Sequence, residues 1–200
     1  MSLKTRFQTA FTESIELKRR VLETQGPQVV AAAERLARVF KAGGRVLIFG
    51  NGGSAADAQH LAAEFVNRFQ VERPPLAALA LTTDTSILTA VGNDYDFREI
   101  FAKQVRALGK PGDLAWGIST SGNSPNVVAG LDAARALGLK TLALSGGDGG
   151  PVAAASEAAL IVDSRNTPRV QEVHITIGHV LCDLVDYLLF PEKFAPPEAG

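Results

Sequence analysis

Short apolar runs alternate with helical patterns along most of this 200-residue chain. The apolar runs lie at residues 45–49, 76–81, 114–118, 141–144 and 159–162. The segments between them predict helices over residues 54–69, 84–91, 97–108, 125–137 and 150–156. The runs are continuous rather than alternating, which is typical of strands buried on both faces. The pattern therefore predicts an α/β fold in three layers, with a five-stranded, mainly parallel sheet and helices on both faces.

The chain begins with helical periodicity and no strand of its own. Apolar residues recur at helical spacing from Phe7 to Leu22 and again from Val29 to Phe40. Because Gly26-Pro27 separates the two patterns, residues 1–42 are predicted to form a pair of helices. With little sheet to pack on, this N-terminal arm is expected to serve oligomerisation.

The remainder is expected to complete a single domain over residues 1–200. Residues 43–190 are predicted to form the sheet region and a closing helix from Arg169 to Phe190. Three prolines within residues 191–200 predict a loose tail. The pattern contains no repeat and no linker long enough to divide the sheet region.

Composition and charge narrow the class of protein. A hydrophobic share of 46% and a charged share of 20% indicate a folded globular chain. The formal net charge of −1 provides no bulk attraction to nucleic acid or to an anionic membrane. No apolar run approaches the roughly 20 residues that span a bilayer, and the N-terminus lacks the apolar core of a signal peptide. We therefore expect a cytoplasmic protein. Its one cysteine, Cys182, excludes an internal disulfide and is expected to be buried.

Two loops rich in glycine and hydroxyl side chains follow predicted strands. The first is Gly50-Asn51-Gly52-Gly53-Ser54, in which Ser54 is expected to cap the next helix. The second is Ser119-Thr120-Ser121-Gly122-Asn123-Ser124, in which Ser124 is expected to be the cap before Pro125. Both would lie at the carboxyl edge of the sheet, where open α/β sheets bind ligands. Hydroxyls and helix N–H groups together predict a phosphate site, and an ordinary structural turn is the alternative for each loop.

Candidate proton-transfer groups lie on two predicted helices. His60 and Glu64 are four residues apart, so they share one helix face and can hold one metal ion or act as an acid–base pair. A surface hydrogen bond is the alternative. Gln171 and His179 are eight residues apart on the closing helix, which corresponds to about 12 Å of helical rise. To meet at one point they would need long side chains, an irregular first turn, or contributions from two subunits.

Taken together, these segments resemble the bacterial phosphoheptose isomerases of the sugar isomerase (SIS) domain superfamily. The resemblance covers nearly the whole chain, to about residue 190, and includes Arg73-Pro74, Asp57, Gly92-Asn93-Asp94 and the segment from Arg169 to His174. It implies an enzyme that converts sedoheptulose 7-phosphate to D-glycero-D-manno-heptose 7-phosphate through an enediol(ate). It also implies a homotetramer with active sites at subunit interfaces.

The resemblance further implies roles for individual residues. His60, Glu64, Gln171 and His179 would bind one zinc ion, with Glu64 as the catalytic base and His179 as the catalytic acid. The residues that would line the sugar phosphate site are Asn51, Gly52, Gly53, Ser54, Arg68, Asp94, Ser119, Thr120, Ser121, Ser124 and Gln171. The chain departs from many family members at Pro168, where they carry an acidic residue.

Two alternatives follow from the same residues. The segment from Leu181 to Asp186 and the sequence Glu72-Arg73-Pro74 are similar to DiaA-type proteins, which use this fold as a tetrameric scaffold for the replication initiator DnaA. The other alternative is an SIS protein that acts on a different sugar phosphate. Because a scaffold does not need both Glu64 and His179, their presence favours an enzyme. None of the three hypotheses includes direct contact with nucleic acid or with a membrane.

Overall fold

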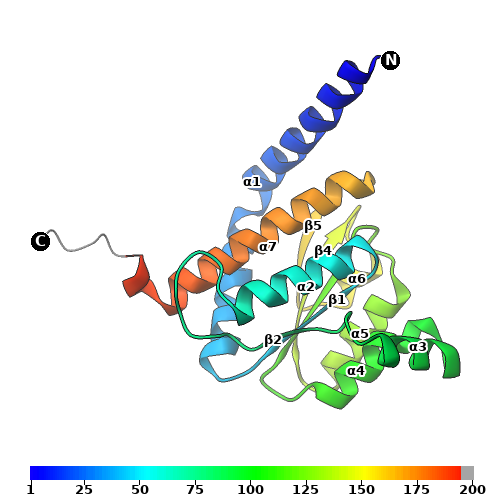
Figure 1. The fold of residues 1–200 in the computed structure, drawn as a ribbon, viewed down its shortest axis with the longest axis vertical. Helices are drawn as coiled ribbons and strands as arrows, with labels where there is room; N and C mark the ends of the chain where they lie inside the picture. The colour runs from blue at the N-terminus through cyan, green and yellow to red at the C-terminus, as the bar shows by residue number, and fades with distance from the viewer. Residues whose placement is uncertain (195–200) are drawn as a thin grey trace, which may run out of the picture.

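A single parallel sheet forms the centre of the computed structural model, which describes residues 1–194 (Figure 1). Its strands are β1 (Val46–Gly50), β2 (Ala78–Ala80), β3 (Leu114–Ser119), β4 (Lys140–Gly146) and β5 (Ala158–Val162). They lie in the order β2-β1-β3-β4-β5, and every neighbouring pair is parallel. The predicted α/β fold with a five-stranded sheet is confirmed.

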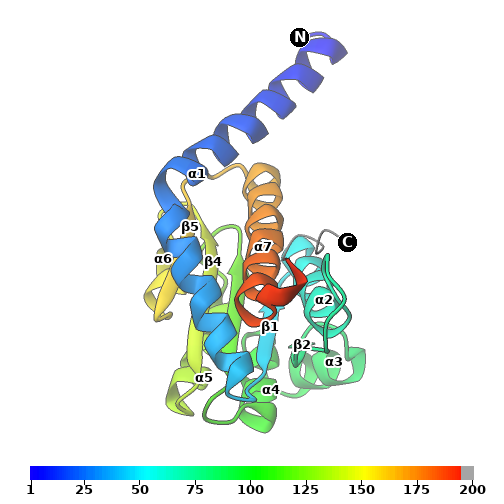
Figure 2. The same ribbon diagram turned by 90° about the vertical axis from the view of Figure 1, so that its left-hand side faces the viewer.

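Helices cover both faces of the sheet. One face carries α1 (Leu3–Lys41), α2 (Gly53–Val66) and α7 (Thr167–Leu189) (Figure 2). The other carries α3 (Thr85–Asp94), the 3-10 turn η1 (Phe97–Glu99), α4 (Ile100–Leu108), α5 (Pro125–Ala136) and α6 (Gly150–Ala154). Successive residues of a strand point to opposite faces, so Ile48 packs in the first core and Phe49 in the second. Two buried cores thus hold the sheet rigidly between its layers.

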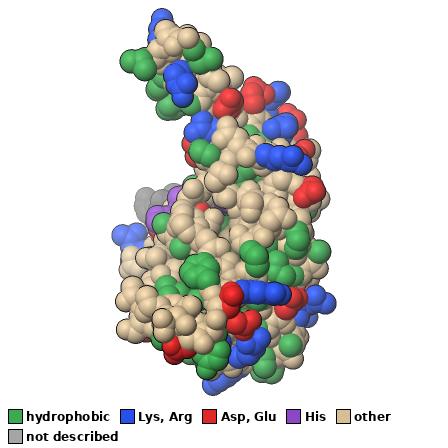
Figure 3. Space-filling view, turned by 90° about the vertical axis from the view of Figure 1, so that its right-hand side faces the viewer, with side chains coloured by type: hydrophobic (Ala, Val, Ile, Leu, Met, Phe, Trp, Pro, Cys, Tyr) green, Lys and Arg blue, Asp and Glu red, His purple; other side chains and the backbone are tan. Residues whose placement is uncertain are grey.

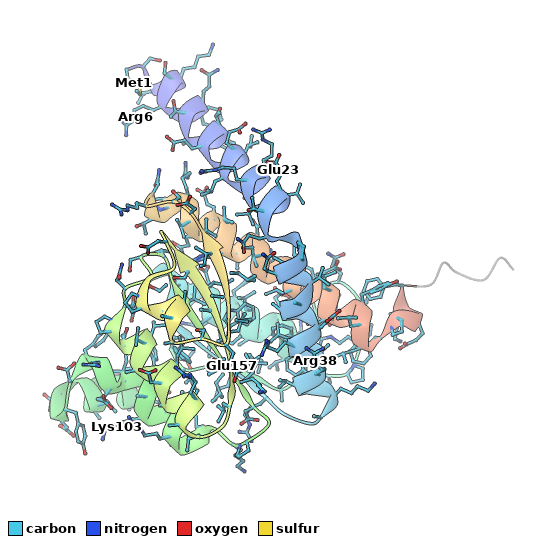
Figure 4. The ribbon with its side chains drawn as sticks, turned by 180° about the vertical axis from the view of Figure 1, so that it is seen from behind. Met1, Arg6, Glu23, Arg38, Lys103 and Glu157 are labelled. Carbon is cyan, nitrogen blue, oxygen red and sulfur yellow. The ribbon has the colours of Figure 1, made fainter. Side chains whose placement is uncertain are left out.

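The N-terminal arm differs from the predicted pair of helices. Residues Leu3–Lys41 form one continuous helix of 39 residues with Pro27 inside it. Figure 4 shows the helix bending between Glu23 and Arg38. Proline lacks the N–H that would bond the carbonyl of Glu23, and its ring crowds that carbonyl, so the helix kinks without ending. The prediction of a helical pair was therefore wrong, because Gly26-Pro27 bends the helix rather than breaking it.

The two halves of α1 have different surroundings. After the bend the helix packs on the sheet and on α7, and Leu36 is fully buried. Before the bend, Leu17 is still buried, and Ala10 and Glu13 accept hydrogen bonds from Arg169 and Asn166 near the start of α7. The N-terminal end of the helix projects from the body of the molecule, and Figure 3 shows apolar side chains exposed there. Phe7, Phe11 and Ile15 are 61%, 59% and 60% exposed. The projecting end thus presents an exposed apolar stripe.

One helix boundary and the tail also differ from the sequence predictions. Gly52, with φ of 55°, caps α2, so Ser54 lies inside the first helical turn rather than at the cap. Ser124 does precede α5 and Pro125 opens it, as predicted. The tail begins with an ordered 3-10 turn, η2 (Pro191–Lys193), and Phe194 packs edge-on against Tyr187. The rest of the predicted loose tail, residues 195–200, lies outside the described residues. None of the helices within residues 1–194 has both the length and the apolar character needed to cross a bilayer.

Candidate active site

The two glycine- and serine-rich loops meet at the carboxyl edge of the sheet. β1 and β3 are neighbours, and the loops leave them at Gly50 and Ser119. The side-chain amides of Asn51 and Asn126 exchange two hydrogen bonds of 2.8 Å, which tie the first loop to α5. The predicted proximity of the loops is confirmed, and Asn126 is a contact that the sequence pattern did not predict.

Serine hydroxyls cluster in the second loop. The Oγ of Ser119 lies 2.9 Å from that of Ser124 and 3.4 Å from that of Ser121. Gly122 has φ of 72°, and a Cβ there would lie 2.8 Å from the carbonyl oxygen of Gly149, so only glycine fits this turn. Hydroxyl groups and the N-terminus of α5 together form a cradle suited to an anion.

α2 and α7 lie side by side on one face of the sheet and run in the same direction (Figure 1). A Cβ on Gly178 would lie 2.6 Å from a methyl carbon of Leu61, so the helices approach closely only because residue 178 is glycine. The next residue, His179, consequently faces the part of α2 that carries His60 and Glu64. One chain thus brings His179 to the predicted pair without a second subunit.

His60, Glu64 and His179 form a compact cluster. The two imidazole Nε2 atoms lie 2.8 Å apart, and His60 Nε2 lies 3.3 Å from a Glu64 carboxylate oxygen. One ligand atom from each residue lies within 4.8 Å of the other two. Phe69 stacks on the His179 ring with a centroid separation of 5.4 Å. The His60 side chain is 48% exposed and the Glu64 side chain 22%, so the cluster is open to ligands, and Figure 3 shows histidine at the molecular surface.

These three side chains have the donor types and spacing of a metal site. Two imidazoles and a carboxylate are a known set for catalytic zinc, whose bonds of about 2.0–2.2 Å place tetrahedral ligand atoms roughly 3.3 Å apart. The separations in the cluster bracket that value. The same groups also fit acid–base chemistry, since each can accept or donate a proton.

Gln171, the fourth predicted metal ligand, lies beside the first turn of α2. Its amide fills the space that a Cβ on Gly53 would take, and it hydrogen-bonds the carboxyl group of Asp57. His60 and Glu64 lie on the second and third turns of the same helix. Burial raises the pKa of Asp57 to about 6, while the Gln171 hydrogen bond and nearby His60 oppose the shift. Gln171, which is on α7, therefore contacts the N-terminal end of α2.

The remaining predicted residues separate into two groups. Ser54 and Ser119 are buried at the sheet edge, and Thr120 and Ser121 line an open cavity of about 440 Å³ beside the loop. Arg68 and Asp94 are exposed and pair locally, with Glu72 and Asn93. Within residues 1–194, no hydrogen bond or ion pair joins Arg68 or Asp94 to the other predicted site residues.

A buried ion pair that was not predicted from the sequence adjoins the cluster. Arg73 Nε donates to Asp186 Oδ1 at 2.8 Å, and both side chains are fully buried. A carboxylate on the apolar face of the closing helix, seven residues after His179, is the signal that could have identified it. Cys182, which lies between His179 and Asp186 on α7, is buried as predicted.

The third histidine of the chain does not belong to the cluster. His174 is fully buried on α7, and neither of its ring nitrogens has a hydrogen-bond partner among the described residues. Burial lowers its pKa to about 4, with a smaller opposing effect from the Ser145 backbone. His174 is therefore neutral at physiological pH.

Known proteins share both the sequence and the fold of this chain. The family described as SIS domain matches residues 10–146. The phosphoheptose isomerase of Nitratidesulfovibrio vulgaris is 56% identical over 92% of this chain and 88% of its own length, and that of Roseiflexus sp. is 56% identical over 90% and 91%. The solved structure of phosphoheptose isomerase GmhA from Neisseria gonorrhoeae superposes with a TM-score of 0.88 at 46% identity, over 92% of this chain and 99% of that one. The chain belongs to the phosphoheptose isomerase family of SIS-domain proteins.

Proposed function

We propose that the protein is an aldose–ketose isomerase that converts sedoheptulose 7-phosphate to D-glycero-D-manno-heptose 7-phosphate in the cytoplasm. The observation that carries the proposal is the cluster of His60, Glu64 and His179 in a chain that is 56% identical to a phosphoheptose isomerase. The reaction moves a carbonyl between C2 and C1, so it requires groups that remove one proton and deliver another. The cluster contains such groups within 4.8 Å of one another.

We assign the two ends of the substrate to separate places in the site. The phosphate would bind at the two loops, held by helix N–H groups and by the hydroxyls of Ser54, Ser119, Thr120, Ser121 and Ser124. The reacting carbons would lie at the cluster, which begins on the second turn of α2. Because the phosphate is remote from the reacting carbons, its binding supplies energy that positions them without itself changing during the reaction.

Proton transfer would be divided between two side chains. Glu64, as a carboxylate, abstracts the proton from one carbon to give an enediol(ate) and returns it to the other. His179 donates and accepts protons at the substrate oxygens, and Phe69 holds its ring by stacking. The Nε2 atoms of His60 and His179 lie 2.8 Å apart, so His60 is able to orient His179.

The donor set favours a zinc ion held by His60, Glu64 and His179, with Gln171 as the further ligand that the resemblance implies. When bound, zinc would polarise the substrate carbonyl and stabilise the charge that develops on its oxygen. We expect one zinc ion per site.

We further propose a homotetramer with active sites at subunit interfaces. The N-terminal half of α1 exposes Phe7, Phe11 and Ile15 on one stripe, and a contiguous exposed apolar stripe is typical of an interface. Asp94 lies on α3, on the opposite face of the sheet from α2 and α7. A site that includes Asp94 would therefore be completed by another subunit.

Metal removal tests the zinc proposal. Dialysis against a strong chelator should abolish isomerisation, and one equivalent of Zn²⁺ per chain should restore it. Elemental analysis of protein purified without added zinc should find the ion before dialysis. Unchanged activity in the metal-free protein would contradict the zinc proposal while leaving the isomerase proposal intact.

A further inference from the structure

The segment between α2 and β2 carries a buried arginine that contacts both helices of the cluster. The Arg73 guanidinium donates 2.8 Å and 2.7 Å hydrogen bonds to the backbone oxygens of Glu64 and Phe65. Those carbonyls belong to the last turn of α2, whose oxygens have no partner within the helix. The positive charge also suits the negative end of the helix dipole. Arg73 therefore caps α2 at the residue that supplies the proposed base.

The same guanidinium reaches α7. Its Nε donates to Asp186 Oδ1 at 2.8 Å, and the two side chains are 0% and 1% exposed. Asp186 follows His179 by seven residues, which is two helical turns, so the two side chains point to nearly the same face of α7. The contact between Gly178 and Leu61 sets how closely the helices approach. It does not by itself stop one helix from sliding along the other.

We propose that Arg73 and Asp186 are positioning residues, which fix α2 against α7 so that His179 meets His60 and Glu64 in metal-binding geometry. This inference rests on the proposed function for the role of the cluster. Few contacts separate the ion pair from the cluster, because Arg73 donates a hydrogen bond to the main chain of Glu64 and Asp186 is on the same helix as His179. A slide of α7 by a fraction of a turn would separate the imidazoles, which lie 2.8 Å apart.

The test compares two Asp→Asn variants of the full-length protein. Asp186→Asn removes the carboxylate charge from the pair. Asp113→Asn is the matched control, because Asp113 is also buried and also pairs with an arginine, Arg45, at 3.5 Å. Arg45 and Asp113 precede β1 and β3, so they lie at the amino edge of the sheet, away from the cluster. A double variant, Arg73→Met with Asp186→Leu, avoids leaving a lone buried charge and protects the test if Asp186→Asn does not fold.

The measurements are Zn²⁺ affinity by chelator competition, the absorption spectrum of the Co²⁺-loaded protein, and kcat and KM. We expect the Asp186 variants to bind Zn²⁺ about 10- to 100-fold more weakly, as is typical for residues that hold metal ligands in place. Their Co²⁺ spectrum should change and kcat should fall, while KM stays within about twofold because the phosphate loops are untouched. Asp113→Asn should lower the melting temperature and leave metal affinity and spectrum as in the wild type.

Three results would overturn the inference. The first is a folded Asp186 variant with wild-type zinc affinity and kcat. The second is an equal loss in Asp113→Asn, which would indicate general loosening. The third is a wild-type protein that binds no zinc. By contrast, selective loss of zinc affinity in a protein that never isomerises sedoheptulose 7-phosphate would support the positioning role and refute the proposed function.

Discussion

Glu64 is proposed to combine two roles, metal ligand and catalytic base, which affect its basicity in opposite ways. As a metal ligand it shares electron density with a cation and becomes a weaker base, whereas the proposed proton abstraction requires a base. Its side chain lies 3.3 Å from His60 and is 22% exposed, so it can reach both a metal ion and a substrate. The basicity of this one carboxylate therefore has to suit both metal binding and proton abstraction.

Glu64→Gln keeps the size of the side chain and removes the basic carboxylate. We expect kcat to fall by about 10²- to 10⁴-fold, the range typical of general acid–base groups, with the oligomer unchanged. The measurement is steady-state kinetics with zinc content checked in the same sample. Glu34→Gln is the control, since Glu34 is an exposed carboxylate on α1 and should leave kcat unaltered. Full activity of Glu64→Gln would exclude it as the base.

His174 makes a separate prediction about pH and stability. Its pKa is lowered to about 4 in the folded chain, so the unfolded state binds more protons between pH 6.5 and pH 4. The free energy of unfolding should therefore be unaffected by this group above pH 6.5 and should decrease as the pH falls, by up to about 3 kcal/mol near pH 4. Urea unfolding of the wild type and of His174→Leu across this range isolates the effect. An identical pH dependence in both proteins would contradict it.

At the scale of elements, the hydrophobic pattern predicted the sheet well because its central strands, β1, β3 and β4, are buried on both faces along nearly their whole length. Continuous runs such as residues 114–118 are nearly the same as the observed β3. The exception was Gly26-Pro27, since local signals do not reveal whether a proline bends a helix or ends it. That outcome depends on packing after the bend, where Leu36 is buried between the sheet and α7.

The candidate site was predictable only where its residues are close in the sequence. The four-residue spacing of His60 and Glu64 is enough to place them on one helix face. The approach of His179 depends on the close packing of α7 on α2 at Gly178, which spacing along one helix does not encode. Asn126 and the pair of Arg73 and Asp186 were missed for the same reason, because their partners are distant in sequence.

The projecting part of α1 is the element on which oligomerisation is predicted to depend. Phe11→Glu places a charge in the exposed apolar stripe, and burying that charge at an interface is costly. We expect the dissociation constant of the tetramer to rise about tenfold or more, measured by light scattering after size exclusion. Arg6→Glu changes the charge on the same half of the helix without entering the stripe and should leave the tetramer intact. A fully tetrameric Phe11→Glu protein would contradict the assignment of this stripe to the interface.

At the scale of the whole molecule, the sheet acts as a rigid platform that carries two kinds of chemistry. Its carboxyl edge carries the loops proposed to bind phosphate, and one helical layer carries the cluster proposed to transfer protons. The near-neutral net charge of −1 is consistent with this design, because hydroxyls and helix N-termini bind phosphate without a basic surface. Function thus arises from the arrangement of layers rather than from overall charge.

The most direct test of the central claim is incubation of the purified protein with sedoheptulose 7-phosphate in D₂O, followed by NMR. The account predicts formation of D-glycero-D-manno-heptose 7-phosphate, with solvent deuterium at C2 of the aldose to the extent that the proton held by Glu64 exchanges with solvent before it is delivered there. Fructose 6-phosphate and other ketose phosphates, tested in parallel, show whether another sugar is preferred. Absence of the aldose, with zinc-loaded and tetrameric protein, would contradict the account, and binding of DnaA by that protein would favour the scaffold alternative.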